Sequence, residues 1–185
     1  MTDSEIIDLF FERSEQAIPE IIKNHGASVG HVAYNILGNA QDTEECVNDT
    51  WLAAWNSIPP TRPLRLGSFL CRIARNLAIK KYHSNSACKR NSYYDLALDE
   101  LSECISSGSS PEDEYSAKEL TVLIDSFLDA LSYEDRFVFM RRYWYADSLE
   151  NIAEMSGMSY GSVSVRLHRI RNKLKKLLTK EGLLV

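Results

Sequence analysis

The chain has 185 residues, of which 44% are hydrophobic and 25% are charged, with a formal net charge of −5. This length suffices for one medium-sized domain or two small ones, and the composition is that of an ordinary globular protein. No apolar run approaches the ~20 residues that cross a bilayer, and the acidic N-terminus is unlike a secretory signal, so we expect a cytoplasmic protein with no stable membrane insertion.

The negative net charge hides a strong segregation of charge along the chain. Every charged residue from Arg62 to Arg90 is basic, whereas the stretch from Asp95 to Asp129 holds ten acids and a single lysine. The C-terminal segment is basic again. Two basic segments separated by an acidic one predict two contacts with nucleic acid and a connector that avoids the phosphates.

The chain shows helical periodicity and no convincing strand-like alternation. We expect a helix from about Asp3 towards Lys23, broken near Pro19, and a second segment from Gly26 to Gly38. A third helix, from about Gln41 to Asn56, begins with acids, which the helix dipole favours. Its inward face is expected to hold Cys46, Val47, Thr50, Trp51, Ala54 and Trp55.

A proline-rich stretch, Ile58 to Arg65, follows the third helix. It contains three prolines, which cannot occupy a helix interior, so we predict a stiff, extended loop. A fourth helix should then run from about Leu66 to Ser84.

The fourth helix carries a broad polar face. Arg72, Arg75 and Asn76 lie within a little over one turn, and Lys80 lies one turn beyond Asn76. Guanidinium and amide groups suit phosphate binding and hydrogen bonding to the base edges of a displaced DNA strand. The alternative is an ordinary solvated helix face, which the lack of acids in this segment disfavours.

A change of composition marks a connector. Serines, acids and a glycine accumulate between Asn85 and Pro111, and we assign residues 88–110 to a flexible acidic linker containing one short helix around Tyr94 to Cys104. Beyond it, one helix should run from Ser110 to about Leu131 and another from Ser132 to Tyr145. We therefore predict an all-α protein of two small helical domains, residues 1–87 and 111–185.

The last segment, Ser148 to Leu178, has the layout of a helix-turn-helix. A short helix capped by Asp147 or Ser148 ends at Gly157, which can adopt the positive φ required there. Ser159 can cap a long second helix, whose apolar positions recur at spacings of four and three: Val163, Leu167, Ile170, Leu174 and Leu177. A basic second helix is typical of a DNA-reading motif, although helical hairpins with a solvated basic face are also common.

The start of that second helix supplies the candidates for DNA contact. Free backbone N–H groups at a helix N-terminus can hold a phosphate, and side chains on the outward face of the following turns can face the major groove. The candidates are Ser159, Tyr160, Ser162, Ser164, Val165, Arg166, Arg169 and Lys173.

The residues of catalytic or metal sites do not occur at suitable spacings. The four cysteines, Cys46, Cys71, Cys88 and Cys104, form no ligand cluster, so we predict neither zinc nor disulfides, and buried thiols for Cys46 and Cys71. No glycine-rich phosphate loop or catalytic triad spacing is present. We expect no cofactor, no metal and no enzymatic activity.

Two segments together resemble a known family. The sequences QDTEECVNDTWLAAWNSI and LGSFLCRIARNLAIKKYHS look like the promoter-melting domain of bacterial RNA polymerase sigma factors, and SLENIAEMSGMSYGSVSVRLHRIRNKLKKLL looks like their domain that reads the upstream promoter element. A chain with just these two domains resembles the extracytoplasmic-function (ECF) group. The resemblance implies a sigma factor that binds core RNA polymerase, recognises the −35 and −10 promoter elements, melts DNA and starts transcription.

The resemblance also implies roles for individual residues. The helix from Asp42 to Trp55 matches the one that docks on the polymerase, with Asp42, Glu45, Asn48, Asp49, Thr50 and Trp55 at the matching positions. The downstream element and the melted strand would contact Arg65, Arg72, Arg75, Asn76 and Lys80. Lys80 and Ser164 depart from the family pattern, where an acid and a lysine respectively are common. A cognate anti-sigma factor is a further expected partner.

Two other functions remain open on the sequence alone. A free-standing helix-turn-helix regulator would bind duplex without polymerase and would dimerise on a palindrome, but no dimerisation heptad is evident. A sigma-like decoy that only captures an anti-sigma factor would not need to retain Arg72, Arg75, Asn76, Arg166 and Arg169.

Overall fold

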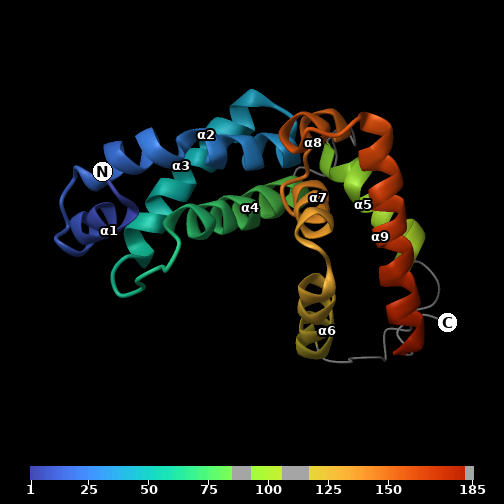
Figure 1. Ribbon diagram of the computed structural model, residues 1–185. Coiled ribbons are helices and arrows are strands. Elements are labelled where there is room, and N and C mark those ends of the chain that lie inside the picture. Colours follow the sequence, from blue (N-terminus) through green and yellow to red (C-terminus); the bar gives the residue numbers. More distant parts are fainter. Residues whose placement is uncertain (85–92, 106–116, 182–185) are drawn as a thin grey trace. The chain divides into compact units, whose positions relative to one another are not determined.

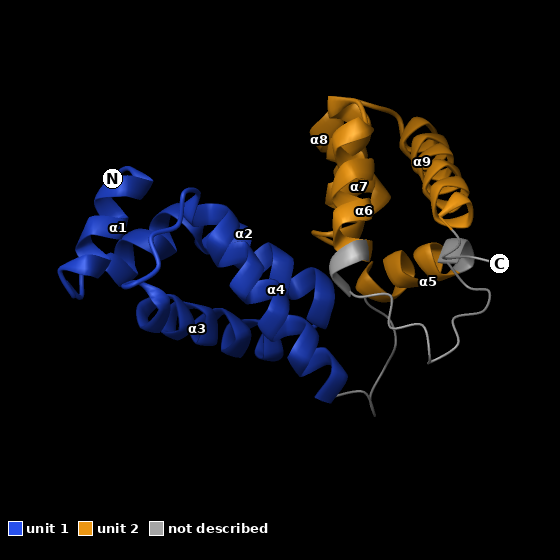
Figure 2. Ribbon diagram, turned by 90° about the horizontal axis from the view of Figure 1, so that it is seen from below, with its two compact units in different colours: residues 1–92 blue, residues 93–185 orange. Residues whose placement is uncertain are grey.

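A computed structural model of the protein describes residues 1–84, 93–105 and 117–181, and helices with no strand make up the regular structure of these residues (Figure 1). They pack as two compact units, residues 1–92 and residues 93–185 (Figure 2). The predicted all-α fold is confirmed. In the described ranges no helix is both long enough and apolar enough to cross a membrane.

Unit 1 is a bundle of α1 (Asp3–Phe11), α2 (Ala17–Leu37), α3 (Ala40–Ser57) and α4 (Leu66–Ser84). The helices α2, α3 and α4 pack pairwise against one another, and α1 closes one end against α2 and α4 (Figure 1). The side chains that meet between them are fully buried and include Ile21, Val29, Val32, Ile36, Ala54, Leu66 and Leu70. Burial of this apolar surface is the main stabilising contribution to the unit.

The first two helices differ from the prediction. The break falls at residues 12–16, and α2 continues without interruption through Gly26. Pro19 lies in the first turn of α2, where its missing N–H has no intrahelical partner to lose, so it does not break the helix. The predicted end of this helix is confirmed, because Gly38 is its C-cap with φ 70°.

Unit 2 contains α5 (Tyr93–Ile105), α6 (Ala117–Ala130), α7 (Tyr133–Tyr143), α8 (Leu149–Ser156) and α9 (Tyr160–Lys180). The long α9 packs against α5, α7 and α8. One buried cluster joins these helices and includes Ala97, Phe127, Val138, Ile152, Val163, Leu167, Ile170 and Leu174. The stripe predicted on α9 is therefore the core-facing side, with Leu178 buried in it and Leu177 partly buried.

The expected linker contains a helix that belongs to unit 2. The short helix predicted near Tyr94 is present as α5, but it packs on α7 and α9, and Ala97 is buried in the cluster of unit 2. This acidic helix can pack here because Arg142 and Arg171 of unit 2 form ion pairs with its Glu100. The remaining linker residues, 88–92 and 106–110, lie outside the described residues, as does the predicted helix start at Ser110.

Candidate nucleic-acid interface

The helix-turn-helix forms with the caps that the sequence allows. The Ser148 hydroxyl accepts a hydrogen bond from the Asn151 N–H at 3.1 Å, so Ser148 and not Asp147 caps α8. Gly157 ends α8 with φ 67°, a conformation that glycine adopts without strain. Ser159 caps α9 by accepting from the Ser162 N–H at 3.2 Å. The loop between α8 and α9 therefore leaves the start of α9 exposed.

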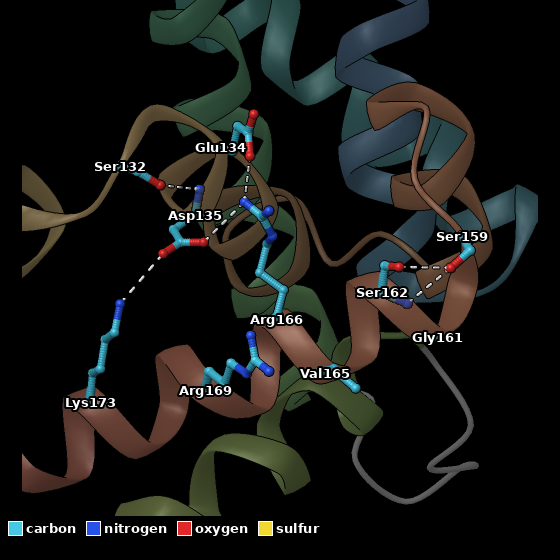
Figure 3. A pocket seen from close by; sticks show the side chains of 10 residues that line it. All are labelled: Ser132, Glu134, Asp135, Ser159, Gly161, Ser162, Val165, Arg166, Arg169 and Lys173. Carbon is cyan, nitrogen blue, oxygen red and sulfur yellow. Dashed lines mark hydrogen bonds and ion pairs between the residues drawn. The ribbon is translucent and has the colours of Figure 1, made fainter.

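A surface hollow of about 870 Å³ lies between the first turn of α7 and the outward side of α9 (Figure 3). Its lining includes six of the eight residues predicted to face duplex DNA: Ser159, Ser162, Val165, Arg166, Arg169 and Lys173. The other two predicted residues do not line the hollow: Tyr160 is exposed outside it, and Ser164 is half-buried. The structure thus gathers most of the predicted contact residues on one face.

The charges on this face are not all positive. Nη1 of Arg166 lies 2.7 Å from a Glu134 carboxylate oxygen and 3.2 Å from one of Asp135, both in the first turn of α7 (Figure 3). Nζ of Lys173 lies 3.6 Å from the other Asp135 oxygen. Arg169 is exposed, and no ion pair to it occurs within the described ranges. The cationic face is therefore open at Arg169 and partly neutralised at Arg166.

The polar face of α4 is exposed in unit 1. Arg72, Asn76 and Lys80 are exposed, Arg75 is half-buried, and Arg65 is exposed in the loop before the helix. The Arg72 guanidinium lies 5.6 Å from the centre of the Phe69 ring, a cation–π contact that orients it along the helix surface. These side chains can reach a nucleic-acid strand without a change in the fold.

The acids at the start of α3 have a partner in α4. Lys81 forms ion pairs with Asp42, at 3.2 Å, and with Glu45. The hydrogen bond that the Lys81 ammonium donates to the Glu45 carboxylate raises the pKa of Lys81, so this lysine is charged at neutral pH. Asn48 and Asp49, one turn further, are exposed.

Two of the predicted polymerase-binding residues face inward. Thr50 is fully buried, and its hydroxyl donates to the Cys46 carbonyl at 2.8 Å, so it cannot contact a partner surface in this conformation. Trp55 is half-buried, with its ring 5.8 Å from that of Phe10 and beneath the Arg13 guanidinium at 5.3 Å. The reason is helical periodicity, since both positions lie on the core-facing side of α3.

Sequence reasoning missed the acids that face the cationic side chains. The sequence predicts only a helix start at Ser132, and this cap is confirmed by the Asp135 N–H donating to the Ser132 hydroxyl at 3.2 Å. Their closeness to Arg166 depends on the packing of α7 against α9, which no local pattern encodes. Among the described residues no cluster of three or more His, Cys, Asp or Glu could hold a metal ion.

Two helical units of this kind, one ending in a helix-turn-helix, match two family models in chain order. Residues 21–87 match Sigma-70 region 2, and residues 121–174 match Sigma-70, region 4. The first match covers most of α2 and all of α3 and α4, and the second covers α7, α8 and most of α6 and α9.

Curated proteins are similar over almost the whole chain. The ECF RNA polymerase sigma factor SigL of Mycobacterium tuberculosis (strain H37Rv) is 30% identical over 162 residues, 85% of this chain and 86% of that protein. SigW of Bacillus subtilis (strain 168), another ECF RNA polymerase sigma factor, is 27% identical over 172 residues, 89% and 90% of the two chains. The chain belongs to the ECF RNA polymerase sigma factors.

A solved structure also aligns with this chain. The structure of CnrH in complex with the cytosolic domain of CnrY is 21% identical, covers 96% of this chain and 97% of that chain, and has a TM-score of 0.44. This similarity is too low to add to the assignment, which depends on the sequence matches.

Proposed function

We propose that this sigma factor directs RNA polymerase to promoters by binding duplex DNA through α9 and the separated strand through α4. The observation that supports the proposal is that each unit exposes cationic side chains on a helix that lies within a matched Sigma-70 region: Arg169 and Lys173 on α9, Arg72 and Lys80 on α4. Guanidinium and ammonium groups on an exposed helix face neutralise phosphates and release counterions.

In unit 2, the first turns of α9 would enter the major groove of the upstream element. The Ser159 cap leaves backbone N–H groups of the first turn directed outward, where they can bind a phosphate. Val165 is exposed and can contact a thymine methyl group, while Arg166 and Arg169 can reach guanine edges.

In unit 1, Arg72, Asn76 and Lys80 would hold the displaced strand of the melted downstream element. Arg65 precedes this face and Arg75 contributes from its edge. The protein would supply binding energy and no bond-making chemistry: capture of unpaired bases offsets the few kcal/mol that each unstacked step costs. It would act in the cytoplasm, where polymerase and promoter DNA are found.

The polar side chains at the start of α3 would dock on core polymerase. The docking residues in this proposal are Asp42, Glu45, Asn48 and Asp49. The buried Thr50 and the half-buried Trp55 would instead hold α3 against the core of unit 1.

Replacing exposed Asp49 by Asn should weaken binding to core polymerase, and replacing exposed Glu44 on the same helix by Gln is the matched control. A competition assay against a labelled sigma factor measures both, and equal affinities would contradict the docking role. A cognate anti-sigma factor completes the proposed partners.

Run-off transcription tests the function as a whole. Core polymerase plus this protein should yield a defined product from some member of a library of genomic promoter fragments, and core alone should not. A product that is absent with the protein present would overturn the proposal.

A further inference from the structure

Two acids lie on the rim of the surface assigned to DNA, where they should repel phosphates. Glu134 and Asp135 occupy the first turn of α7 and line the same hollow as Arg166 and Arg169 (Figure 3). Helix capping alone does not require both, because the Ser132 hydroxyl already accepts the Asp135 N–H. Their contacts across the hollow suggest a second role.

The acids are held in place before any DNA arrives. Both are in the first turn of α7, where the helix dipole stabilises negative charge, and the Ser132 cap fixes the backbone of Asp135. The Asp135 side chain is 18% exposed, so it has little freedom to turn away from α9. Glu134 is 66% exposed and approaches Arg166 from the solvent side.

The way in which Arg166 is held leaves one edge of its guanidinium available. Both carboxylates contact Nη1, at 2.7 Å and 3.2 Å. A guanidinium has five N–H donors in a rigid plane, and its Nε and Nη2 groups form the side-on fork that binds two acceptors together. No bond from that fork occurs among the described residues. The acids therefore hold the side chain through Nη1, and its bidentate edge has no partner among the described residues.

Asp135 also spans two turns of α9. Its two oxygens contact Arg166 and Lys173, which are seven residues apart and share one helix face. The Lys173 contact is the looser one, with a nitrogen–oxygen distance of 3.6 Å and a side chain that is 61% exposed. One carboxylate thus restrains both cations and cancels part of their charge.

We propose that Glu134 and Asp135 are positioning residues that set the sequence selectivity of the α9 surface. By orienting Arg166 they favour a bidentate contact with one base pair, and by neutralising charge they weaken the attraction to phosphates that every duplex offers. Selectivity is a difference of affinities, and both effects increase it. This inference rests on the proposed function of unit 2 in reading duplex DNA.

The test compares holoenzymes formed by core polymerase with wild-type protein or with the Glu134→Gln/Asp135→Asn double variant. A duplex library with a randomised upstream segment is selected with the wild-type holoenzyme, and the affinities for the enriched duplex and for a scrambled duplex are then measured over a salt series. The double variant should bind the scrambled duplex more tightly, with a salt slope steeper by about 0.9 for each additional phosphate neutralised. Its ratio of affinities, enriched over scrambled, should fall about tenfold.

A matched control separates the position of the acids from their charge. The Asp99→Asn/Asp125→Asn variant changes the net charge of unit 2 by the same amount, and both of these aspartates are exposed and outside the lining of the hollow. It should keep the wild-type ratio. An unchanged ratio in the Glu134→Gln/Asp135→Asn variant, or an equal fall in the control, would overturn the inference.

A thermodynamic cycle distinguishes positioning from a purely structural role. In an Arg166→Ala background the two amide substitutions should cause a much smaller fall in the ratio, because the contacts with the arginine are gone and only the contact between Asp135 and Lys173 remains. A further fall of the same size would show that they act on the fold. The single Glu134→Gln variant, at the more exposed position, should show a smaller fall without any change in thermal unfolding. A wild-type holoenzyme that enriches no sequence would overturn the proposed function as well, whereas an unchanged ratio overturns this inference alone.

Discussion

Glu100 on α5 accepts a hydrogen bond from Nη2 of Arg142 on α7 at 2.6 Å, joining two residues that are 42 positions apart in the chain. The other Glu100 oxygen accepts from the Tyr143 hydroxyl at 3.0 Å and from Nη1 of Arg171 at 2.9 Å. The Arg142 side chain is only 4% exposed, and its Nη1 donates to the Asp147 carbonyl at 2.8 Å. One carboxylate therefore ties α5 to both α7 and α9.

This network predicts a stability role for a residue from the acidic segment. Replacing Glu100 by Gln leaves two guanidinium groups without their counter-charge, one of them buried. We expect the free energy of unfolding of unit 2 to fall by about 3 kcal/mol, at the lower end for a broken buried pair because Glu100 is itself 26% exposed. Native-state hydrogen exchange of the α7 and α9 amides measures the loss, and the exposed neighbour Asp99→Asn should leave it unchanged.

The recognition helix yields a prediction about the upstream element. Replacing Arg169 by Ala should lower the affinity of the holoenzyme for its selected upstream duplex by about 1–3 kcal/mol, roughly 5- to 150-fold. Binding to a scrambled duplex should weaken much less, because phosphate contacts are spread over many side chains. Fluorescence anisotropy measures both affinities. Lys180→Ala, an exposed change at the far end of α9, is the control, and equal losses for the two variants would contradict a base contact by Arg169.

The face of α4 predicts a defect at a later step. Asn76→Ala should leave the closed complex on duplex promoter DNA unaffected. It should destabilise the melted complex relative to the closed one by about 1 kcal/mol, which lowers the melted population roughly fivefold. Permanganate reactivity of unpaired thymines reports the melted state. If Asn76 holds the separated strand, as the proposed function requires, the defect should persist on a template with a pre-melted mismatch bubble. If Asn76 acts only during opening, that template should reduce the defect. The control is Asn56→Ala, the same substitution at an exposed position on α3.

The buried thiol of Cys46 predicts a loss of stability in alkali. Burial raises its pKa from the usual 9.0 to about 11, with the negative charge of Asp49 adding to the effect. Between these two pH values the unfolded chain releases the proton first, so the free energy of unfolding of unit 1 falls as the pH rises from about 9 to about 11. Urea unfolding followed by tryptophan fluorescence in a Trp144→Phe protein reports on unit 1 through Trp51 and Trp55. The Cys46→Ala variant should show a shallower decline, and an identical slope would contradict this assignment.

Local patterns were enough to predict the helical fold, the helix-turn-helix and its caps. Ser132, Ser148 and Ser159 each accept from an N–H group three residues further on, and Gly157 directly follows the helix that it ends. Each of these signals is therefore local in the sequence. The buried stripe of α9 follows in the same way from the 3.6-residue period. The order of the two domains follows from motifs that need no tertiary contact to be recognised.

Only the tertiary structure decided which charges are neutralised and by which partners. The contacts of Glu100 with Arg142, of Arg166 with Glu134, and of Lys81 with Asp42 each join helices that are separate in the chain. The same packing made α5 part of unit 2. The physical reason is that a charge pattern specifies how many ions a segment carries, whereas ion pairing falls off steeply with distance and depends on which helix faces pack together.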